Sequence, residues 1–140
     1  MRKSIASVCA VLALLACRSG KPEDQVRQAF EVCRKAVEAG DAVAASAPLD
    51  PAFQGPEGMD KATARLFLIG TLRQEKVGAT VLRNEVAVKG DQALQEVDLV
   101  LTGRSGGLLP QDASHRSFRL RWRKAGTDWK LQELQSLDGR

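Results

Sequence analysis

The chain has 140 residues, with 21 lysines and arginines against 17 aspartates and glutamates, and 44% of its residues are hydrophobic. This length and charge balance fit one globular domain, and they exclude two domains of typical size, a disordered chain and a collagen-like or cysteine-dense scaffold. Apolar residues are concentrated at the start of the chain, where they make up 12 of the first 16 residues.

Residues 1–16 have the organisation of a secretory signal peptide. Arg2 and Lys3 form a positive start, and residues 5–16 form an apolar run. As a helix this run reaches about 18 Å, well short of the roughly 30 Å hydrocarbon core of a bilayer. A cleaved export signal is therefore favoured over a permanent transmembrane anchor.

The apolar run ends in Leu14-Leu15-Ala16-Cys17, which resembles the lipobox of bacterial lipoproteins. The resemblance implies cleavage after Ala16 and lipidation of Cys17, including palmitate. Two or more acyl chains on the cysteine would anchor the protein stably on a membrane. Arg18 stands where inner-membrane lipoproteins of enteric bacteria carry Asp, so the periplasmic face of the outer membrane is favoured over the inner membrane. The alternative is an ordinary signal peptide, with Cys17 a bystander.

The three cysteines have different expected fates. Cys9 leaves with the signal peptide, Cys17 is blocked by lipid, and Cys33 remains, so the mature chain has no pair for an internal disulfide. Cys33 falls on the apolar stripe of the first predicted helix. A small buried apolar residue is favoured there over an interchain disulfide.

Residues 17–22 are predicted to be a lipidated tether and residues 23–140 a single domain. The five residues after Cys17 span at most about 17 Å, which keeps the domain close to the membrane. A helix is predicted from Glu23, because apolar residues recur on one helical stripe. Gly40 ends this helix, and Asp41 caps a short continuation to about Ser46.

A loop is predicted over residues 48–58, which contain three prolines and two glycines, with Phe53 at most tucked inward. Asp60 then predicts the N-cap of a second long helix that runs to about Glu75. Five apolar residues are expected to give this helix a wide inner face: Leu66, Phe67, Leu68, Ile69 and Leu72. We therefore expect the second helix to be more buried than the first.

After Lys76 the apolar residues recur at every second position, which predicts four strands at about 77–89, 92–102, 116–125 and 129–137. The alternation slips within residues 82–85, and this slip predicts a β-bulge. Helices followed by an antiparallel meander indicate an α+β fold, in which two helices pack on a curved four-stranded antiparallel sheet.

Two segments resemble the nuclear transport factor 2-like (NTF2-like), or SnoaL-like, superfamily. The helix over residues 26–43, with Ala39-Gly40-Asp41 at its end, resembles the family's first helix, and residues 122–131 resemble its closing hairpin. The resemblance implies a cone-like, cystatin-like α+β domain, whose interior is a pocket in some members and filled in others. No strand is predicted before the second long helix, so a reduced version with a shallower cone is expected. The superfamily also contains homodimers.

Enzymes of this superfamily place Asp, His or Tyr inside the cone. This chain has no Tyr, and its one histidine, His115, is expected in a solvated loop without a partner to orient it. One His and one available Cys cannot assemble an N/S metal site, so neither a metal nor a cofactor is predicted. No catalytic residue is assigned.

Five residues could form a polar site at the mouth of the cone. Asn84, Gln95 and Glu133 could point to the apolar side of the sheet, beside Trp122 and Trp129. The alternative, which we favour, is that these polar side chains lie at strand ends and bulges and reach water.

The third predicted strand carries a dense set of cations that includes Arg119, Arg121 and Arg123. These arginines could contact anionic lipid or glycan. Glu96 and Asp98 on the neighbouring strand are expected to lie opposite two of them and to neutralise the patch. Without residues 1–16 the chain has 19 cationic against 17 acidic residues, too weak a field for nucleic-acid binding.

The sequence thus predicts a lipid-anchored protein of the bacterial cell envelope that acts as a non-catalytic binding or interaction module. Its partner would be an envelope protein, a glycan or a small apolar ligand. Two alternatives stay open: a SnoaL-like enzyme with a small apolar ligand in the cone, and a structural protein that binds anionic lipid or glycan through the arginine-rich strand. Enzymatic activity is disfavoured, and a homodimer is compatible with the resemblance.

Overall fold

The computed structural model describes residues 20–103 and 115–138. Three helices, α2 (Pro22–Glu38), α3 (Ala42–Ser46) and α4 (Lys61–Gln74), and a short 3-10 turn, η1 (Pro56–Gly58), accompany five strands. The strands are β1 (Leu49–Gln54), β2 (Gly78–Lys89), β3 (Gln92–Thr102), β4 (His115–Ala125) and β5 (Asp128–Ser136). The predicted signal peptide and Cys17 lie outside the described residues. No helix within the described ranges is long and apolar enough to cross a membrane.

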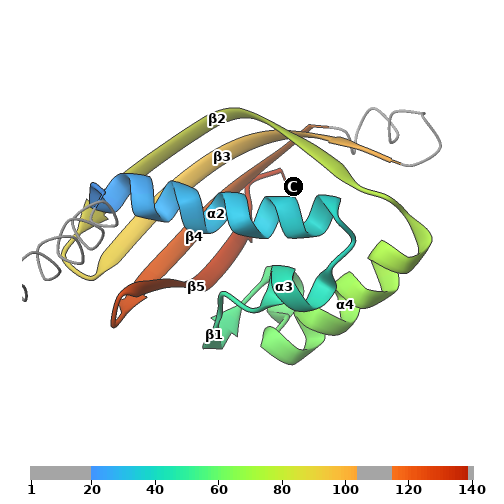
Figure 1. Ribbon diagram of the computed structural model, residues 1–140, viewed down its shortest axis with the longest axis horizontal. Coiled ribbons are helices and arrows are strands. Elements are labelled where there is room, and N and C mark those ends of the chain that lie inside the picture. The colour runs from blue at the N-terminus through green and yellow to red at the C-terminus, as the bar shows by residue number, and fades with distance from the viewer. Residues whose placement is uncertain (1–19, 104–114, 139–140) are drawn as a thin grey trace, which may run out of the picture.

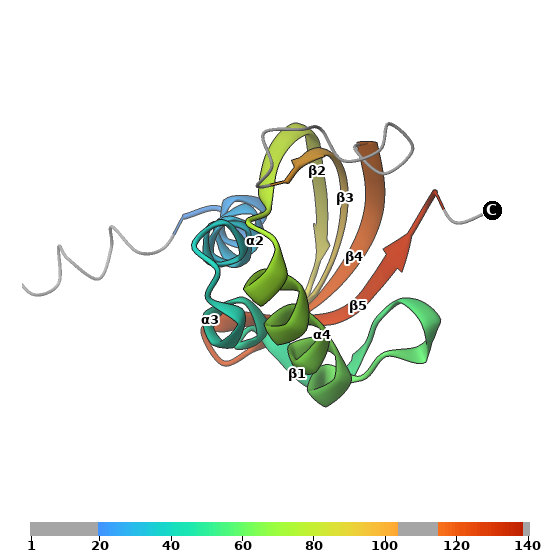
Figure 2. The same ribbon diagram turned by 90° about the vertical axis from the view of Figure 1, so that its right-hand side faces the viewer.

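The strands form one curved sheet in the order β1-β5-β4-β3-β2, and the helices lie on its concave side (Figures 1 and 2). The four strands from β2 to β5 pair antiparallel in chain order, whereas β1 pairs in parallel with β5. The predicted α+β class is confirmed. The sheet has five strands instead of four, and the described chain has three helices.

The extra strand, β1, occupies part of the segment predicted to be a loop. Leu49 lies opposite Leu131 of β5, and the side chains of Leu49 and Phe53 are buried. Pro51 is tolerated because β1 is an edge strand, where one side of the backbone needs no ladder partner. A strand therefore does precede the second long helix, and the loop prediction was wrong. This removes the reason for expecting a reduced version of the fold.

Helix α2 supplies the main helical contribution to the core. Pro22 occupies its first turn, and Val26 and Phe30 are buried against the sheet. Gly40 follows the helix with φ of 74°, a value that favours glycine, and the Asp41 carboxylate accepts the first-turn N–H of Ala44 at 3.0 Å. The structure confirms that the first helix ends before Gly40 and that Asp41 caps the short helix α3.

Helix α2 also protects the free edge of β2. Arg34 donates to the backbone carbonyl of Ala79 at 2.9 Å, and Glu38 accepts a weaker bond from the Ala79 N–H at 3.4 Å. Arg34 is held in place by Glu31 and Glu38 on its own helix. These contacts occupy backbone groups that an edge strand otherwise leaves free for another chain.

Helix α4 begins as predicted, because Asp60 accepts the N–H of Thr63 at 2.8 Å. Its burial is the reverse of the expectation. Only Ala64 is buried, whereas Leu66 and Phe67 are 69% and 57% exposed, since α4 packs on α3 and β1 and not across the sheet. Four consecutive apolar residues, 66–69, surround most of a helix, so some of them must face away from any single neighbour.

This difference between the helices predicts unequal costs of truncation. Phe30→Ala should lower the free energy of unfolding by about 3–5 kcal/mol, because it leaves a cavity in the core. Phe67→Ala should change it by about 0.5 kcal/mol or less, because the ring already contacts water. Urea denaturation measures both. A comparable loss for Phe67→Ala would show that α4 packs inward.

Candidate functional site

Three of the five residues predicted to form a pocket meet on the concave face of the sheet. The indole Nε1 of Trp122 donates to Gln95 Oε1 at 2.8 Å, and Gln95 Nε2 donates to Asn84 Oδ1 at 2.8 Å. The strand register produces this arrangement, since Trp122 lies opposite Ala93, two residues before Gln95. Gln95 and Trp122 are completely buried.

The polar atoms of this chain bond to one another and offer little to a ligand. The indole N–H has a partner, and both polar ends of the Gln95 amide are bonded. Within residues 20–103 and 115–138, no buried side-chain nitrogen or oxygen lacks a hydrogen-bond partner. Because unpaired buried polar groups are costly, the chain Asn84–Gln95–Trp122 is suited to holding three strands together.

Glu133 lies on the other face of the sheet. Trp122 pairs with Leu131 and Arg121 pairs with Glu133, so Gln132 forms a bulge between the two pairs. This extra residue reverses the alternation of β5, and Glu133 accepts a hydrogen bond from Arg121 at 2.9 Å on the outer face. Glu133 therefore fits the favoured alternative, a polar side chain beside a bulge that reaches water, whereas the completely buried Gln95 contradicts that alternative.

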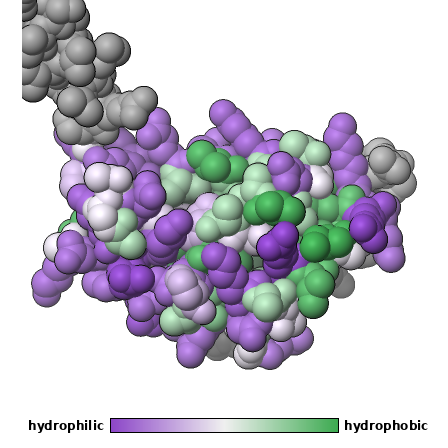
Figure 3. All heavy atoms as spheres, turned by 60° about the horizontal axis from the view of Figure 1, so that its bottom comes forward, coloured by the Kyte–Doolittle hydropathy of each residue, from purple (hydrophilic) through white to green (hydrophobic). Residues whose placement is uncertain are grey.

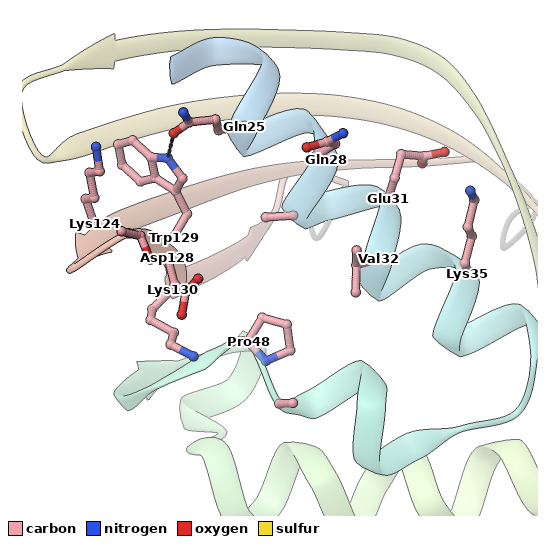
Figure 4. A pocket seen from close by; sticks show the side chains of 13 residues that line it. Gln25, Gln28, Glu31, Val32, Lys35, Pro48, Lys124, Asp128, Trp129 and Lys130 are labelled. Atoms are coloured by element: carbon pink, nitrogen blue, oxygen red, sulfur yellow. Dashed lines mark hydrogen bonds between the residues drawn. The ribbon is translucent and has the colours of Figure 1, made fainter. Parts of the chain in front are cut away.

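The fifth residue, Trp129, lies at the edge of a surface groove of about 910 Å³ (Figure 4). The groove is bounded by α2, by the link between α3 and β1, and by the β4–β5 hairpin. Trp129 donates its indole N–H to Gln25 of α2 at 3.2 Å. The side chains that line the groove are Gln25, Gln28, Ala29, Glu31, Val32, Lys35, Ala47, Pro48, Lys124, Thr127, Asp128, Trp129 and Lys130.

The groove has more available cations than anions. Lys35, Lys124 and Lys130 form no salt bridge with another described residue, and the Lys124 ammonium lies 6.0 Å from the centre of the Trp129 ring. Of the two acids, Glu31 is held by Arg34 at 2.6 Å, which keeps the pKa of Glu31 below its ordinary value. Asp128 is the remaining acid. The groove therefore combines positive charge with apolar surface.

The groove could not be predicted from the sequence, because its lining comes from residues 25–35, 47–48 and 124–130. Pattern analysis places each segment in a helix, a loop or a hairpin without showing that the three are neighbours. The sequence pattern identifies Trp129 only as an inward-facing residue of β5, and not as part of a groove.

Three of the four arginines of β4 form salt bridges with described residues, and Arg116 forms none. Arg119 contacts Glu96 at 3.1 Å, and Arg121 contacts Glu133 at 2.9 Å. Arg123 contacts the buried Asp50 of β1 at 2.7 Å. The Ala52 N–H, and then Arg123, lower the pKa of Asp50. The Arg119–Glu96 contact thus confirms the prediction that Glu96 neutralises one arginine of this strand.

Asp98 differs from its expected role. It lies opposite Ser117, accepts a hydrogen bond from the Ser117 hydroxyl at 2.7 Å and binds Arg83 of β2 at 2.8 Å. It therefore pairs with an arginine of the other neighbouring strand, and not with one of β4.

The remaining sequence candidates do not form a reactive site. His115 is exposed at the first residue of β4, and Cys33 is half-buried on α2. Burial raises the pKa of the Cys33 thiol from 9.0 to about 11, which disfavours the reactive thiolate. No group of three or more His, Cys, Asp or Glu side chains suited to a metal ion occurs among the described residues.

The polar chain on the concave face predicts a coupling that can be measured. Gln95→Leu should lower the free energy of unfolding by about 1–3 kcal/mol, because it leaves the Trp122 N–H buried without a partner. The cost should be smaller in a Trp122→Phe background, which has no N–H to satisfy. A double-mutant cycle in urea measures the difference, with Gln92→Leu at an exposed position of β3 as control. Equal losses in both backgrounds would contradict the coupling.

No protein-family model and no curated protein sequence matches the chain. Solved structures do match it. The structure of Bdellovibrio bacteriovorus Bd1075 aligns with a TM-score of 0.69 and 13% identity over 81% of this chain, and the match spans only 40% of that longer chain.

Two further structures match over most of their length. A putative dehydratase of the NTF2-like family from Streptomyces avermitilis aligns with a TM-score of 0.69 and 18% identity over 81% of this chain and 92% of that one. An NTF2-like protein with a cystatin-like fold from Novosphingobium aromaticivorans gives a TM-score of 0.68 and 18% identity over 100% and 94%. At these identities the likeness concerns the fold alone: the chain has the NTF2-like, cystatin-like fold.

Proposed function

We propose that this protein is a lipid-anchored, non-catalytic binding module of the bacterial cell envelope, held on the periplasmic face of the outer membrane. The lipobox-like sequence that ends in Cys17 supports the anchor. Helix α2 begins at Pro22, so only four residues separate the proposed lipidated cysteine from folded structure. Such a short connection suits a domain that works at the membrane surface.

The observation that carries the binding role is the groove beside Trp129. It is large enough for a ligand and lies on the surface, whereas the polar atoms of the concave face are engaged with one another. The titratable side chains of the groove are not arranged as an acid–base pair held in a dry site. The groove is therefore suited to binding, with little provision for proton transfer.

The lining favours a ligand with carboxylates and some apolar surface. Lys35, Lys124 and Lys130 supply cations, while Val32 and Pro48 supply apolar contacts. A carboxylated glycan of the envelope and an acidic segment of an envelope protein both meet this requirement. Lysines on flexible stems suit such ligands, because they act as mobile point charges.

The two alternatives are less well supported by the geometry. A putative dehydratase and a putative aromatic ring hydroxylase are among the structural neighbours, and they motivate an enzyme acting in the cone. The internally bonded Asn84–Gln95–Trp122 chain disfavours it. Binding of anionic polymer by β4 is disfavoured because Arg119, Arg121 and Arg123 each have an acidic partner.

The anchor predicts that Cys17 is lipidated. Bacteria that express the full chain should incorporate radiolabelled palmitate into it, and Cys17→Ser should abolish the label because it removes the acceptor thiol. Cys33→Ser is the matched control and should be labelled like the wild type. A wild-type chain without label would refute the anchor and the localisation that follows from it.

The groove predicts saturable binding of a carboxylated glycan, for which soluble peptidoglycan fragments serve as the probe. Lys35→Glu combined with Lys130→Glu should weaken binding about 10-fold or more, since two favourable charges become repulsive. Lys76→Glu with Lys89→Glu, outside the groove, is the control of equal charge. Tryptophan fluorescence can follow the titration. Equal weakening by both pairs would indicate nonspecific attraction, and the absence of saturation would exclude this glycan as the ligand.

A further inference from the structure

Helix α4 presents apolar side chains to solvent. Leu66 and Phe67 are adjacent and 69% and 57% exposed, and Val43 on the neighbouring α3 is 55% exposed. Apolar side chains gather over α3 and α4 on the face that Figure 3 shows. Single exposed hydrophobic residues are ordinary, but a group on adjoining helices indicates an interaction surface.

The charges on α4 are all positive. Between Lys61 and Gln74 the helix carries Lys61, Arg65 and Arg73 and no acidic residue. Arg73 lies seven positions after Leu66, on the same helical stripe, and Arg65 is adjacent to Leu66. The exposed apolar residues are thus bordered by cations.

These cations differ from most arginines of the described chain. Six of the nine arginines in residues 20–103 and 115–138 form salt bridges, namely Arg27, Arg34, Arg83, Arg119, Arg121 and Arg123. Arg65 and Arg73 form none with a described residue, and both are exposed. Their charge remains available to an external anion.

We propose that α4 lies on the anionic headgroups of the membrane, with Leu66 and Phe67 inserted into the boundary between headgroups and acyl chains. A helix with apolar residues bordered by cations binds such interfaces, through burial of apolar surface and attraction to anionic lipid. This inference rests on the proposed anchor. The four residues between Cys17 and Pro22 reach at most about 14 Å, which keeps the domain within reach of the bilayer.

The positions of the two contacts would orient the domain. Helix α2 is about 26 Å long, and α4 lies near its C-terminal end, whereas the tether enters at its N-terminal end (Figure 1). Attachment at both ends requires α2 to lie roughly along the membrane surface. The lipid alone would leave the domain free to rotate about its tether.

Charge also favours lipid over a second copy of the chain. A two-fold dimer through α4 would place Arg65 and Arg73 of one copy close to the same residues of the other. Like charges on an apolar interface repel, and between its caps Asp60 and Glu75 the helix has no acidic residue to offset them. Anionic headgroups supply the complementary charge.

Fluorescence quenching tests the contact. The full chain with Phe67→Trp, purified from bacterial membranes, is reconstituted in vesicles of phosphatidylethanolamine and phosphatidylglycerol at three to one, with brominated acyl chains as quenchers. The native Trp122 and Trp129 are buried and give a constant background. Leu82→Trp, at a position 59% exposed on β2, is the matched control.

We expect the bromines to quench the added emission of Phe67→Trp but not that of Leu82→Trp. Adding Arg65→Gln and Arg73→Gln should weaken docking about 30-fold and abolish the quenching, since each cation near an anionic surface contributes a factor of about five. Adding Arg119→Gln and Arg121→Gln to Phe67→Trp instead removes the same number of charges outside α4 and should leave the quenching unchanged.

Unquenched Phe67→Trp, or equal quenching at the two positions, would overturn the proposal. A blue shift that grows with the protein-to-lipid ratio, without quenching, would instead identify a second copy as the occupant. Retention of the N-terminus in the vesicle, by acyl chains or by an uncleaved apolar run, does not affect this readout. Palmitate labelling at Cys17 is scored separately, so failure of the anchor and failure of the α4 contact are distinguishable.

Discussion

The fold depends on how the indole of Trp122 is buried. An indole N–H in an apolar interior is costly unless it is hydrogen-bonded, and Gln95 on the adjacent strand accepts it at 2.8 Å. The Gln95 amide then needs a partner, which Asn84 provides. This chain of bonds crosses β4, β3 and β2, so a slip of one residue in either pairing would break it. Val26 and Phe30 of α2 pack in the same buried cluster as Trp122.

The same arrangement of side chains limits where a ligand could find unpaired polar or charged groups. With the concave face occupied by a bonded polar chain and large apolar side chains, the interior has few free polar groups. On the outer face the acids and arginines neutralise one another across neighbouring strands. Among the described residues, the groove beside Trp129 and the exposed side of α4 are two places where positive charge stays available next to apolar surface. The proposed binding role uses the groove, and the proposed membrane contact uses α4.

Helices α2 and α4 show how two helices of similar apolar content can have different roles. Phe30 faces the sheet and closes the core, whereas Phe67 faces solvent. The difference arises from their neighbours: α2 crosses the sheet, and α4 rests on α3 and β1. The proposed lipid tether at one end and the proposed contact of α4 near the other would together hold the domain against a membrane.

Local signals were sufficient for the boundaries of most elements. Asp41 and Asp60 capped the helices that they predicted, and the slip in alternation located the bulge at Leu82, because caps and periodicity depend on residues close in the chain. The second bulge, at Gln132, moved Glu133 to the outer face, and the parallel pairing of β1 with β5 turned an expected loop into a strand. Only the tertiary structure could decide these two features. The same holds for the exposure of α4 and for the groove, because each depends on contacts between segments far apart in sequence.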